Sequence, residues 1–404
     1  MTRYLVIQLA RFGDLIQTKR LLLSLAAEGA AVHLAVDRSL AKLAGILYPG
    51  VTIHPLAAHG THSDAADVLA ANAVSFAGLR ETGFTAIYAL NYSPLTFALA
   101  ALFEPDMVHG YRRAKGQDLR SRWTRTAFRW TRERRGSPLN LVDFWGFFAE
   151  RPLAPESVNP EATPRGSGRI GIVLAGRESR RSLPPDTLAP CVEGIFAAMD
   201  GPRLALIGSK AERPLARRLV RCFPPALAQK VDDFTGKTAL TDLPELFDGF
   251  DAVLTPDTGA MHLAAHLGVP VRAFFLSSAW AFETGPYGRG HRIWQAVRPC
   301  APCVESTPCP YDTACLSPFR ERAFVRSLAG KESGGWAADL VELEPYFDAL
   351  GQNYRVKKGE IPGDGARLEQ REALAALRGL EAGTFCDSAF ERIVHERDWV
   401  LPDF

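Results

Sequence analysis

Short apolar runs alternate with amphipathic stretches along the first 150 residues. The runs predict buried strands at residues 4–9, 31–36, 51–56 and 85–90. Helix patterns occupy residues 14–28 and 40–47 between them, and Gly29 closes the first. Because parallel strands need a crossover, usually a helix, this alternation predicts a parallel sheet with helices on both faces.

The same alternation returns in the second half, with strands predicted at residues 169–174, 203–207, 251–254 and 271–275. We therefore expect an α/β protein of two doubly wound, Rossmann-like domains, at residues 1–155 and 169–333. The stretch 156–168, rich in Pro, Gly and Ser, is the predicted linker. Ligands of such domains bind at the carboxyl edges of the strands, so a cleft is expected where two such edges face each other.

Residues 334–404 do not continue the alternation of strand and helix patterns. Helix patterns at 340–350, 366–380 and 389–397, interrupted by the polar stretch 357–364, predict a C-terminal helical extension. Two interpretations stay open: an added helical element, or one that packs back across the first domain.

Composition narrows the class of protein. A chain of 404 residues suits two domains of roughly 150 residues each. A hydrophobic content of 47% with 23% charged residues is typical of a soluble globular protein, and a net charge of +2 argues against a globally basic nucleic-acid binder. Arg11 and Asp14 interrupt the first apolar stretch, so no secretory signal is predicted. No apolar run reaches the length of about 18 residues that crosses a bilayer, and we expect a cytoplasmic protein.

The most specific motif spans residues 251–268. A strand pattern stops at a Pro-Asp-Thr-Gly turn, and a helix pattern follows at once and closes at Gly268. Such a turn directs unpaired N–H groups and the positive end of the helix dipole out of the sheet edge, which suits an anion such as a sugar diphosphate. A well-capped helix without a ligand is the alternative. The residues concerned are Asp257, Thr258, Gly259 and His262.

Asp14 lies in the turn that follows the first predicted strand, three residues after Arg11. Two roles stay open for it. As a helix N-cap it is worth about 1 kcal/mol. As a carboxylate at a sheet edge it can accept the proton of an attacking sugar hydroxyl.

Two further strand-to-helix turns contain charged residues. Residues 175–184 hold three arginines, and their guanidinium groups suit bidentate phosphate contacts, although a solvated basic loop is the alternative. Arg181 belongs to this loop. Glu212 ends the next turn. Two roles stay open for it: a carboxylate that accepts hydrogen bonds from a ribose, or a first-turn residue that the helix dipole stabilises.

Four of the seven cysteines form a C-x2-C-x5-C-x5-C cluster at Cys300, Cys303, Cys309 and Cys315. Four thiolates this close can hold a structural zinc or iron ion; reduced thiols or a disulfide pair are the alternatives. His262 and His266 are four residues apart but lack a third ligand. We expect a ligand-facing donor and a packed histidine there instead of a metal site.

Residues 111–135 are strongly basic, with Trp123, Phe128 and Trp130 interleaved. The segment is either a solvated helix face with aromatic anchors or an electropositive surface for an anionic acceptor or acidic membrane headgroups. RNA is disfavoured, because no recognition module accompanies the charge. The candidate acceptor-binding residues are Arg11, Arg112, Arg113 and Arg120.

Three patches resemble glycosyltransferase family 9, the ADP-heptose:lipopolysaccharide heptosyltransferases: residues 5–18, 234–240, and 255–270 with Thr-Gly-Pro-Tyr-Gly at 284–288. The cysteine cluster is similar to one in many members. The resemblance implies the GT-B fold and inverting sugar transfer that needs no metal or other cofactor. It also implies residue roles: Asp14 as general base, Glu212 for the donor ribose, and Asp257, Thr258, Gly259 and His262 for the donor diphosphate and sugar.

The sequence departs from the family twice. Arg-Ser-Leu-Pro at 181–184 replaces a Lys-x-Trp-Pro motif, with Arg181 in place of the lysine charge, and the tail beyond residue 333 is longer. The expected function is heptose transfer from ADP-heptose to a lipopolysaccharide core, an anionic glycolipid, with peripheral contact to the cytoplasmic face of the inner membrane and no nucleic-acid partner. The alternatives are transfer of heptose or another nucleotide-linked sugar to a protein or another glycan, non-catalytic sugar-nucleotide binding, and an epimerase on the same fold.

Overall fold

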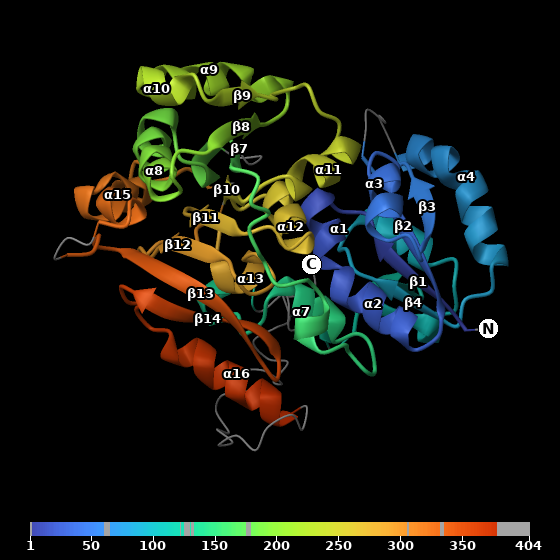
Figure 1. Ribbon diagram of the computed structural model, residues 1–404. Coiled ribbons are helices and arrows are strands. Elements are labelled where there is room, and N and C mark those ends of the chain that lie inside the picture. The colour runs from blue at the N-terminus through green and yellow to red at the C-terminus, as the bar shows by residue number, and fades with distance from the viewer. Residues whose placement is uncertain are drawn as a thin grey trace. The chain divides into compact units, whose positions relative to one another are not determined.

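Alternating strands and helices build one sheet in each of two units of the chain (Figure 1). The computed structural model describes residues 2–59, 65–121, 123–124, 130, 133–174, 179–304, 307–331 and 335–377. The first unit comprises Met1–Glu133, Leu141–Val158 and the described residues from Glu369. The second comprises Arg134–Asn140 and Asn159–Leu368.

The first unit contains a six-stranded sheet of order β3-β2-β1-β4-β5-β6. Its strands pair in parallel, except that β6 is antiparallel to β5. Leu5, Val6 and Ile7 of β1 are all fully buried, because helices cover both faces of a parallel sheet. The main elements are β1 (Arg3–Gln8), α1 (Phe12–Gln17), α2 (Lys19–Ala27), β2 (Ala31–Asp37), α3 (Ala41–Leu47), β3 (Thr52–Leu56), α4 (Ala65–Glu81), β4 (Ala86–Ala89), α5 (Pro94–Ala100), β5 (Val108–Ala114), β6 (Gln117–Arg120) and α7 (Leu141–Gly146).

The four strands predicted for this unit are confirmed, but the single helix predicted at 14–28 is wrong. It is divided into α1 and α2 at Thr18. The Thr18 hydroxyl donates to the Asp14 carbonyl at 2.8 Å and accepts from Gln8 Nε2 at 3.0 Å. A threonine side chain bonded to the carbonyl four residues earlier competes with the backbone ladder, which accounts for the break.

The basic segment does not begin as a helix. Residues 108–114 and 117–120 form the hairpin β5–β6, because Lys115 and Gly116 both adopt positive φ, at 51° and 78°, as a tight two-residue turn requires. The later part of the expected helix face, including Arg122, Arg125, Phe128, Arg129 and Arg132, lies outside the described residues.

The second unit contains an eight-stranded sheet of order β14-β13-β12-β11-β10-β7-β8-β9. It is parallel from β12 to β9, and β13 and β14 are added antiparallel. Helix α8 packs against α9 and α15, and α12 packs against β10 and β11. The main elements are η2 (Arg134–Gly136), β7 (Arg169–Val173), η4 (Ser179–Arg181), α8 (Pro185–Ala198), β8 (Arg203–Ile207), η5 (Lys210–Glu212), α9 (Arg213–Cys222), α10 (Pro225–Ala228), β9 (Val231–Asp233), α11 (Leu243–Asp248), β10 (Ala252–Pro256), α12 (Gly259–His266), β11 (Val271–Phe275), α13 (Ala281–Thr284), β12 (Arg292–Ala296), α14 (Ser317–Arg320), α15 (Arg322–Leu328), β13 (Leu340–Asp348) and β14 (Gly351–Lys358).

The prediction of a helical extension over 334–404 is wrong for its first part. The helix expected at 340–350 is the strand β13, which pairs with β14 and extends the sheet from β12. Val341 and Leu343 are buried on one side of a period-two pattern, and Pro345 would break a helix interior. The helix expected at 366–380 is present as α16 (Gly365–Leu377), and the pattern at 389–397 lies outside the described residues. Within the described part of the chain, no helix is long and apolar enough to span a bilayer.

Candidate functional site

The Pro-Asp-Thr-Gly turn joins β10 to α12, as the sequence predicts. Thr258 caps the helix: its Oγ1 accepts the N–H of Met261 at 3.3 Å and lies 3.2 Å from Oγ1 of Thr255. Thr258 and Gly259 are half-buried, whereas α12 is buried from Met261 onward. The first turn of the helix therefore remains in reach of solvent, with the positive end of its dipole beside it.

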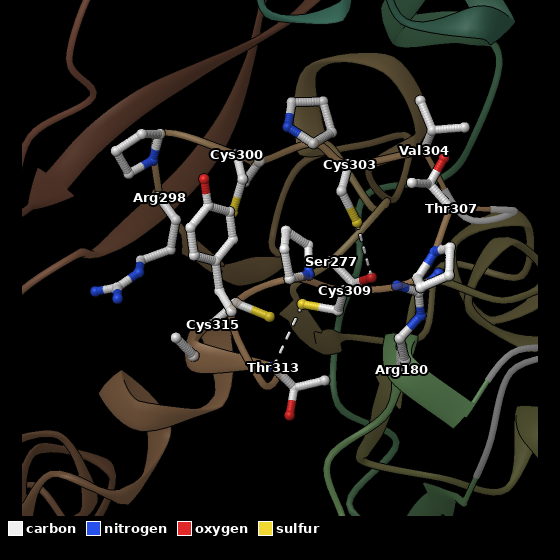
Figure 2. Close-up of a pocket in the computed structure, with 17 residues that line it drawn as sticks. Arg180, Ser277, Arg298, Cys300, Cys303, Val304, Thr307, Cys309, Thr313 and Cys315 are labelled. Atoms are coloured by element: carbon white, nitrogen blue, oxygen red, sulfur yellow. Dashed lines mark hydrogen bonds between the residues drawn. The ribbon is translucent and has the colours of Figure 1, made fainter.

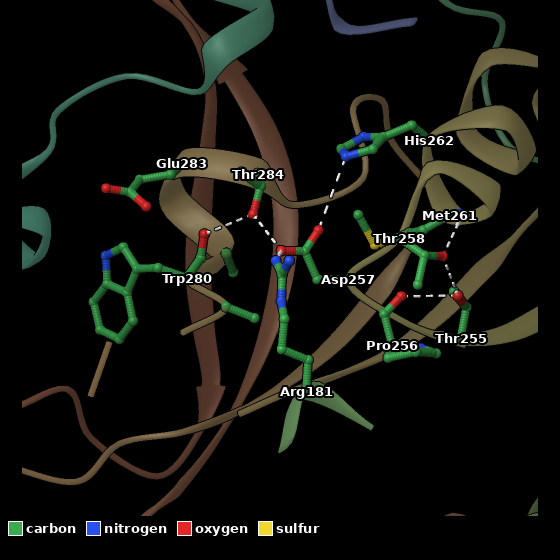
Figure 3. A network of polar contacts seen from close by, with 12 residues as sticks. Arg181, Thr255, Pro256, Asp257, Thr258, Met261, His262, Trp280, Glu283 and Thr284 are labelled. Carbon is green, nitrogen blue, oxygen red and sulfur yellow. Dashed lines mark hydrogen bonds and ion pairs between the residues drawn. The ribbon is translucent and has the colours of Figure 1, made fainter. Parts of the chain in front are cut away.

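Asp257 is the centre of a polar network at this turn (Figure 3). Its Oδ2 accepts hydrogen bonds from the guanidinium of Arg181, at the end of η4, and at 3.0 Å from the hydroxyl of Thr284, at the end of α13. The carboxylate is nearly fully buried, and the guanidinium is partly exposed. The network thus fixes a planar cation whose exposed edge suits a phosphate.

His262 lies in the first turn of α12 close to Asp257, with its Nε2 3.9 Å from Asp257 Oδ1. Burial lowers the pKa of His262 to about 4, the nearby Asp257 carboxylate opposes this, and Arg181 adds to it. The imidazole is therefore neutral at pH 7, with one N–H to donate and one nitrogen to accept. His266 is buried on the same helix, which confirms the expected packed histidine.

A second ion pair adjoins Thr284. Arg134 donates from Nε and Nη2 to Glu283 Oε2, at 2.9 and 2.5 Å. Burial raises the pKa of Glu283, and the guanidinium of Arg134 opposes that rise. The sequence reasoning missed Glu283 and the role of Thr284, although Thr284 opens the Thr-Gly-Pro-Tyr-Gly motif. Arg134 belongs to the basic segment 111–135, but no local pattern indicates its pair with Glu283, because the two residues are 149 positions apart in the chain.

In the first unit, Asp14 lies inside the first turn of α1, and Arg11 is the residue that precedes the helix. The N–H of Arg11 donates to Asp14 Oδ2 at 3.1 Å. The N-cap alternative for Asp14 is thus corrected to a first-turn carboxylate that bonds back to the cap residue. Asp14 is half-buried and Arg11 is exposed.

Glu212 has a local bond of the same kind in the second unit. Its Oε2 accepts the N–H of Ser209 at 2.6 Å, while Ser209 Oγ accepts the N–H of Ala211 at 3.1 Å. These bonds fix the start of η5 and give one carboxylate oxygen a structural partner.

The candidate acceptor-binding arginines of the hairpin β5–β6 have local partners. Arg112 donates to the Pro105 carbonyl at 2.7 Å, and Arg113 pairs with Asp118 at 2.7 Å. The guanidinium of Arg120 lies 4.9 Å from the ring centroid of Tyr92, a ring that is half exposed. The guanidinium of Arg113 lies 5.9 Å from the ring centroid of Phe97. Arg113 and Arg120 thus place positive charge at the surface of the first unit next to aromatic rings.

The four clustered cysteines line one cavity of about 500 Å³ in the second unit (Figure 2). Cys303 Sγ lies 3.2 Å from Ser277 Oγ, and Cys309 Sγ accepts the N–H of Thr313 at 3.4 Å. Backbone N–H groups of Tyr311 and Thr313 lower the pKa of Cys309, while burial raises that of Cys315.

The donor chemistry of this cavity suits a soft metal such as zinc or iron, since four thiols face it. Among the described residues, however, no three His, Cys, Asp or Glu side chains converge closely enough to hold an ion. As arranged, the cluster fits free thiols, and coordination requires the sulfurs to move together.

Comparison with known proteins relates this site to one family. Residues 197–313 match the model of glycosyltransferase family 9 (heptosyltransferase). The matched stretch includes Glu212, Asp257, Thr258, Gly259 and His262, whereas Asp14 and Arg181 lie outside it.

Two curated relatives are similar over shorter stretches. Lipooligosaccharide heptosyltransferase 2 of Haemophilus influenzae is 26% identical over 145 residues, which cover 36% of this chain and 35% of the relative. Lipopolysaccharide heptosyltransferase 1 of Pseudomonas aeruginosa is 36% identical over 104 residues, 26% of this chain and 27% of the relative. The chain thus spans about a third of the length of the curated relatives that it matches.

The fold is similar over a longer range. The structure of Escherichia coli ADP-heptose lipopolysaccharide heptosyltransferase II superposes with a TM-score of 0.54 at 17% identity, covering 72% of this chain and 90% of that one. This likeness confirms the expected GT-B-type architecture of two Rossmann-like sheets.

Proposed function

We propose that the chain transfers heptose from ADP-heptose to a lipopolysaccharide core acceptor, with inversion at the anomeric carbon. The Asp257 network supports this best, because it joins a buried carboxylate, a partly exposed guanidinium and a helix N-terminus at one strand-to-helix turn. The names of the two curated relatives support the donor sugar and the acceptor class.

Charge assigns the donor-side roles. Asp257 would repel a diphosphate and therefore accepts hydrogen bonds from sugar hydroxyls, with neutral His262 beside it. Arg181 and the first turn of α12, with Thr258 and Gly259, hold the diphosphate, and Glu212 holds the ribose. As the bond to the leaving group breaks, Arg181 and the helix end stabilise the negative charge that grows on ADP. This proposal uses no metal in the transfer step.

Asp14 is the proposed general base. Its carboxylate takes the proton of the acceptor hydroxyl while that oxygen attacks the anomeric carbon. Residues 1–155 form the acceptor side in this proposal and residues 169–333 the donor side, with 156–168 between them. Arg11, Arg112, Arg113 and Arg120 attract the anionic glycolipid, at the cytoplasmic face of the inner membrane.

We further propose that Cys300, Cys303, Cys309 and Cys315 hold one structural zinc or iron ion. Their shared cavity supports this, because four cysteines that line one space can bind one ion as thiolates. Bound metal would cross-link the 300–315 segment and would take no part in transfer.

The decisive experiment measures ADP release from ADP-heptose, with and without heptose-deficient lipopolysaccharide. We expect release that depends on the acceptor. Release of free nucleotide without an acceptor would indicate an epimerase or a hydrolase. Binding of ADP-heptose without release would indicate a non-catalytic protein, and release only with a protein or another glycan would change the acceptor.

A further inference from the structure

The turn after Thr284, residues 285–288, is buried, and side-chain amides bond its backbone. Asn140 Nδ2 donates to the Gly285 carbonyl at 3.1 Å. Gln352 Nε2 donates to the Pro286 carbonyl at 2.8 Å, and Asn159 Nδ2 donates to the Tyr287 carbonyl at 2.8 Å. Since a buried carbonyl without a partner is costly, these three amides determine which conformation the turn adopts.

Gln352 forms hydrogen bonds with two residues of this turn. Besides its bond to Pro286, its Oε1 accepts the N–H of Gly288 at 2.6 Å. The Gln352 side chain is almost completely buried, and its Nε2 also donates to the hydroxyl of Tyr354. One amide thus spans the turn, with its donor on one residue and its acceptor on another.

The rest of the hairpin β13–β14 and α16 supports the same segment. The Tyr354 hydroxyl occupies the space that a Cβ on Gly285 would fill. Tyr354 packs edge-on against Phe282 of α13, with ring centroids 5.4 Å apart, and the guanidinium of Arg367 lies 3.8 Å from the centroid of the same ring. These contacts come from residues beyond the stretch that matches the family model.

These contacts are connected to the Asp257 network through Thr284. Thr284 immediately precedes the turn, and its hydroxyl bonds Asp257 at 3.0 Å and the Trp280 carbonyl at 3.4 Å. A shift of the turn moves Thr284, and Asp257 then loses one of the two donors that orient it beside Arg181.

We propose that Gln352 is a positioning residue for the donor sugar: its two bonds to the 285–288 turn hold Thr284 against Asp257. This rests on the proposed function, in which Asp257 accepts hydrogen bonds from the sugar. Gln352 acts through the turn, because its own side chain is almost completely buried. Its loss should weaken binding in the ground state and the transition state alike, which raises KM with little change in kcat.

The test uses the full chain with Gln352→Met, which keeps the volume and removes both bonds. We expect KM for ADP-heptose to rise about tenfold, with kcat within about threefold of the wild type. Asn72→Leu is the matched control. Asn72 is an equally buried amide that accepts from the N–H of Ala57 and donates to the Ala57 carbonyl, in the first unit and without a bond to the turn. It should lower thermal stability and leave KM unchanged.

A double mutant separates positioning from a general loss of stability. Thr284→Val alone should raise KM as Gln352→Met does. Adding Gln352→Met to it should raise KM by less than about twofold more, because both changes act on one contact. If Gln352→Met does not fold, Gln352→Asn takes its place, because the asparagine side chain is too short to bond both Pro286 and Gly288. Unchanged KM, or full additivity with Thr284→Val, would overturn the inference. A wild-type protein that binds no ADP-heptose would overturn the proposed function instead.

Discussion

Arg181 and Asp257 form an ion pair in which the carboxylate is 5% exposed and the guanidinium 23% exposed. A pair this deeply placed recovers its desolvation cost only with good geometry, and Thr284 supplies a further hydrogen bond to the carboxylate. The two side chains differ in exposure, because Asp257 keeps only a small exposed fraction while the guanidinium of Arg181 is more open to solvent. Arg181 is therefore held in place by Asp257 while part of its guanidinium stays open to solvent, as the proposed diphosphate site requires.

Arg181→Ala should lower affinity for ADP at least about tenfold, as measured by calorimetry, because a charged hydrogen-bond donor to phosphate is lost. Arg181→Lys should recover part of the loss, since lysine keeps the charge but not the planar fork. Arg203→Ala is the control, because its ion pair with Asp232 is exposed and at the surface. Equal ADP affinity in the wild type and in Arg181→Ala would refute the proposed role of Arg181 in donor binding.

Asp14→Asn should abolish transfer while the melting temperature changes little. An asparagine oxygen can still accept the N–H of Arg11, so the helix start is kept and only the proton acceptor is lost. Asp14→Ala should abolish transfer and also destabilise the protein by about 0.5–2 kcal/mol. Near-normal turnover in Asp14→Asn, measured as ADP release, would exclude Asp14 as the base.

Arg20 and Asp143 join α2 to α7 through a buried ion pair at 2.6 Å. Asp143→Ala should destabilise the protein by about 3–5 kcal/mol in urea unfolding, because it leaves the Arg20 charge buried without its carboxylate. The double change Arg20→Met with Asp143→Leu should cost clearly less, since it leaves no buried charge. A double variant as unstable as Asp143→Ala would contradict this explanation.

Acid should destabilise the second unit through two histidines. Burial lowers the pKa of His262 and of His291 to about 4, against about 6.5 in an unfolded chain. The unfolded state therefore binds more protons between pH 4 and 6.5, and stability falls as pH is lowered through that window, by up to about 3 kcal/mol for each histidine. His291→Asn should reduce this dependence in denaturant titrations at pH 7.5, 6 and 5. An unchanged slope would exclude His291.

Metal analysis of the purified protein should find about one zinc or iron ion per chain if the four-cysteine proposal is correct, in line with the tetrahedral preference of four thiolates. Cys303→Ser and Cys309→Ser should lower the metal content, and chelation should lower the melting temperature with transfer retained. Cys222→Ser, on the exposed end of α9, is the control. A protein that is purified without chelators and contains no metal would refute the proposal.

The sequence predicted the strands and the Asp257 turn well, because their signals are local: a buried run such as residues 169–174, or a helix cap such as Thr258. It failed where the decisive partner is distant. The pair of Arg134 with Glu283 and the bonds of Gln352 to the 285–288 turn join residues far apart in the chain. The strand β13 was mistaken for a helix because its apolar residues also fit a helical period, although the alternation around Val341 and Leu343 and the presence of Pro345 favour a strand.

The antiparallel hairpin β13–β14 has one more consequence, for the design of shorter fragments. A fragment that ends before Leu340 would leave β12 as an open edge strand with a row of unbonded amides, a template for intermolecular pairing and aggregation. A soluble fragment of the second unit should therefore extend at least through Lys358.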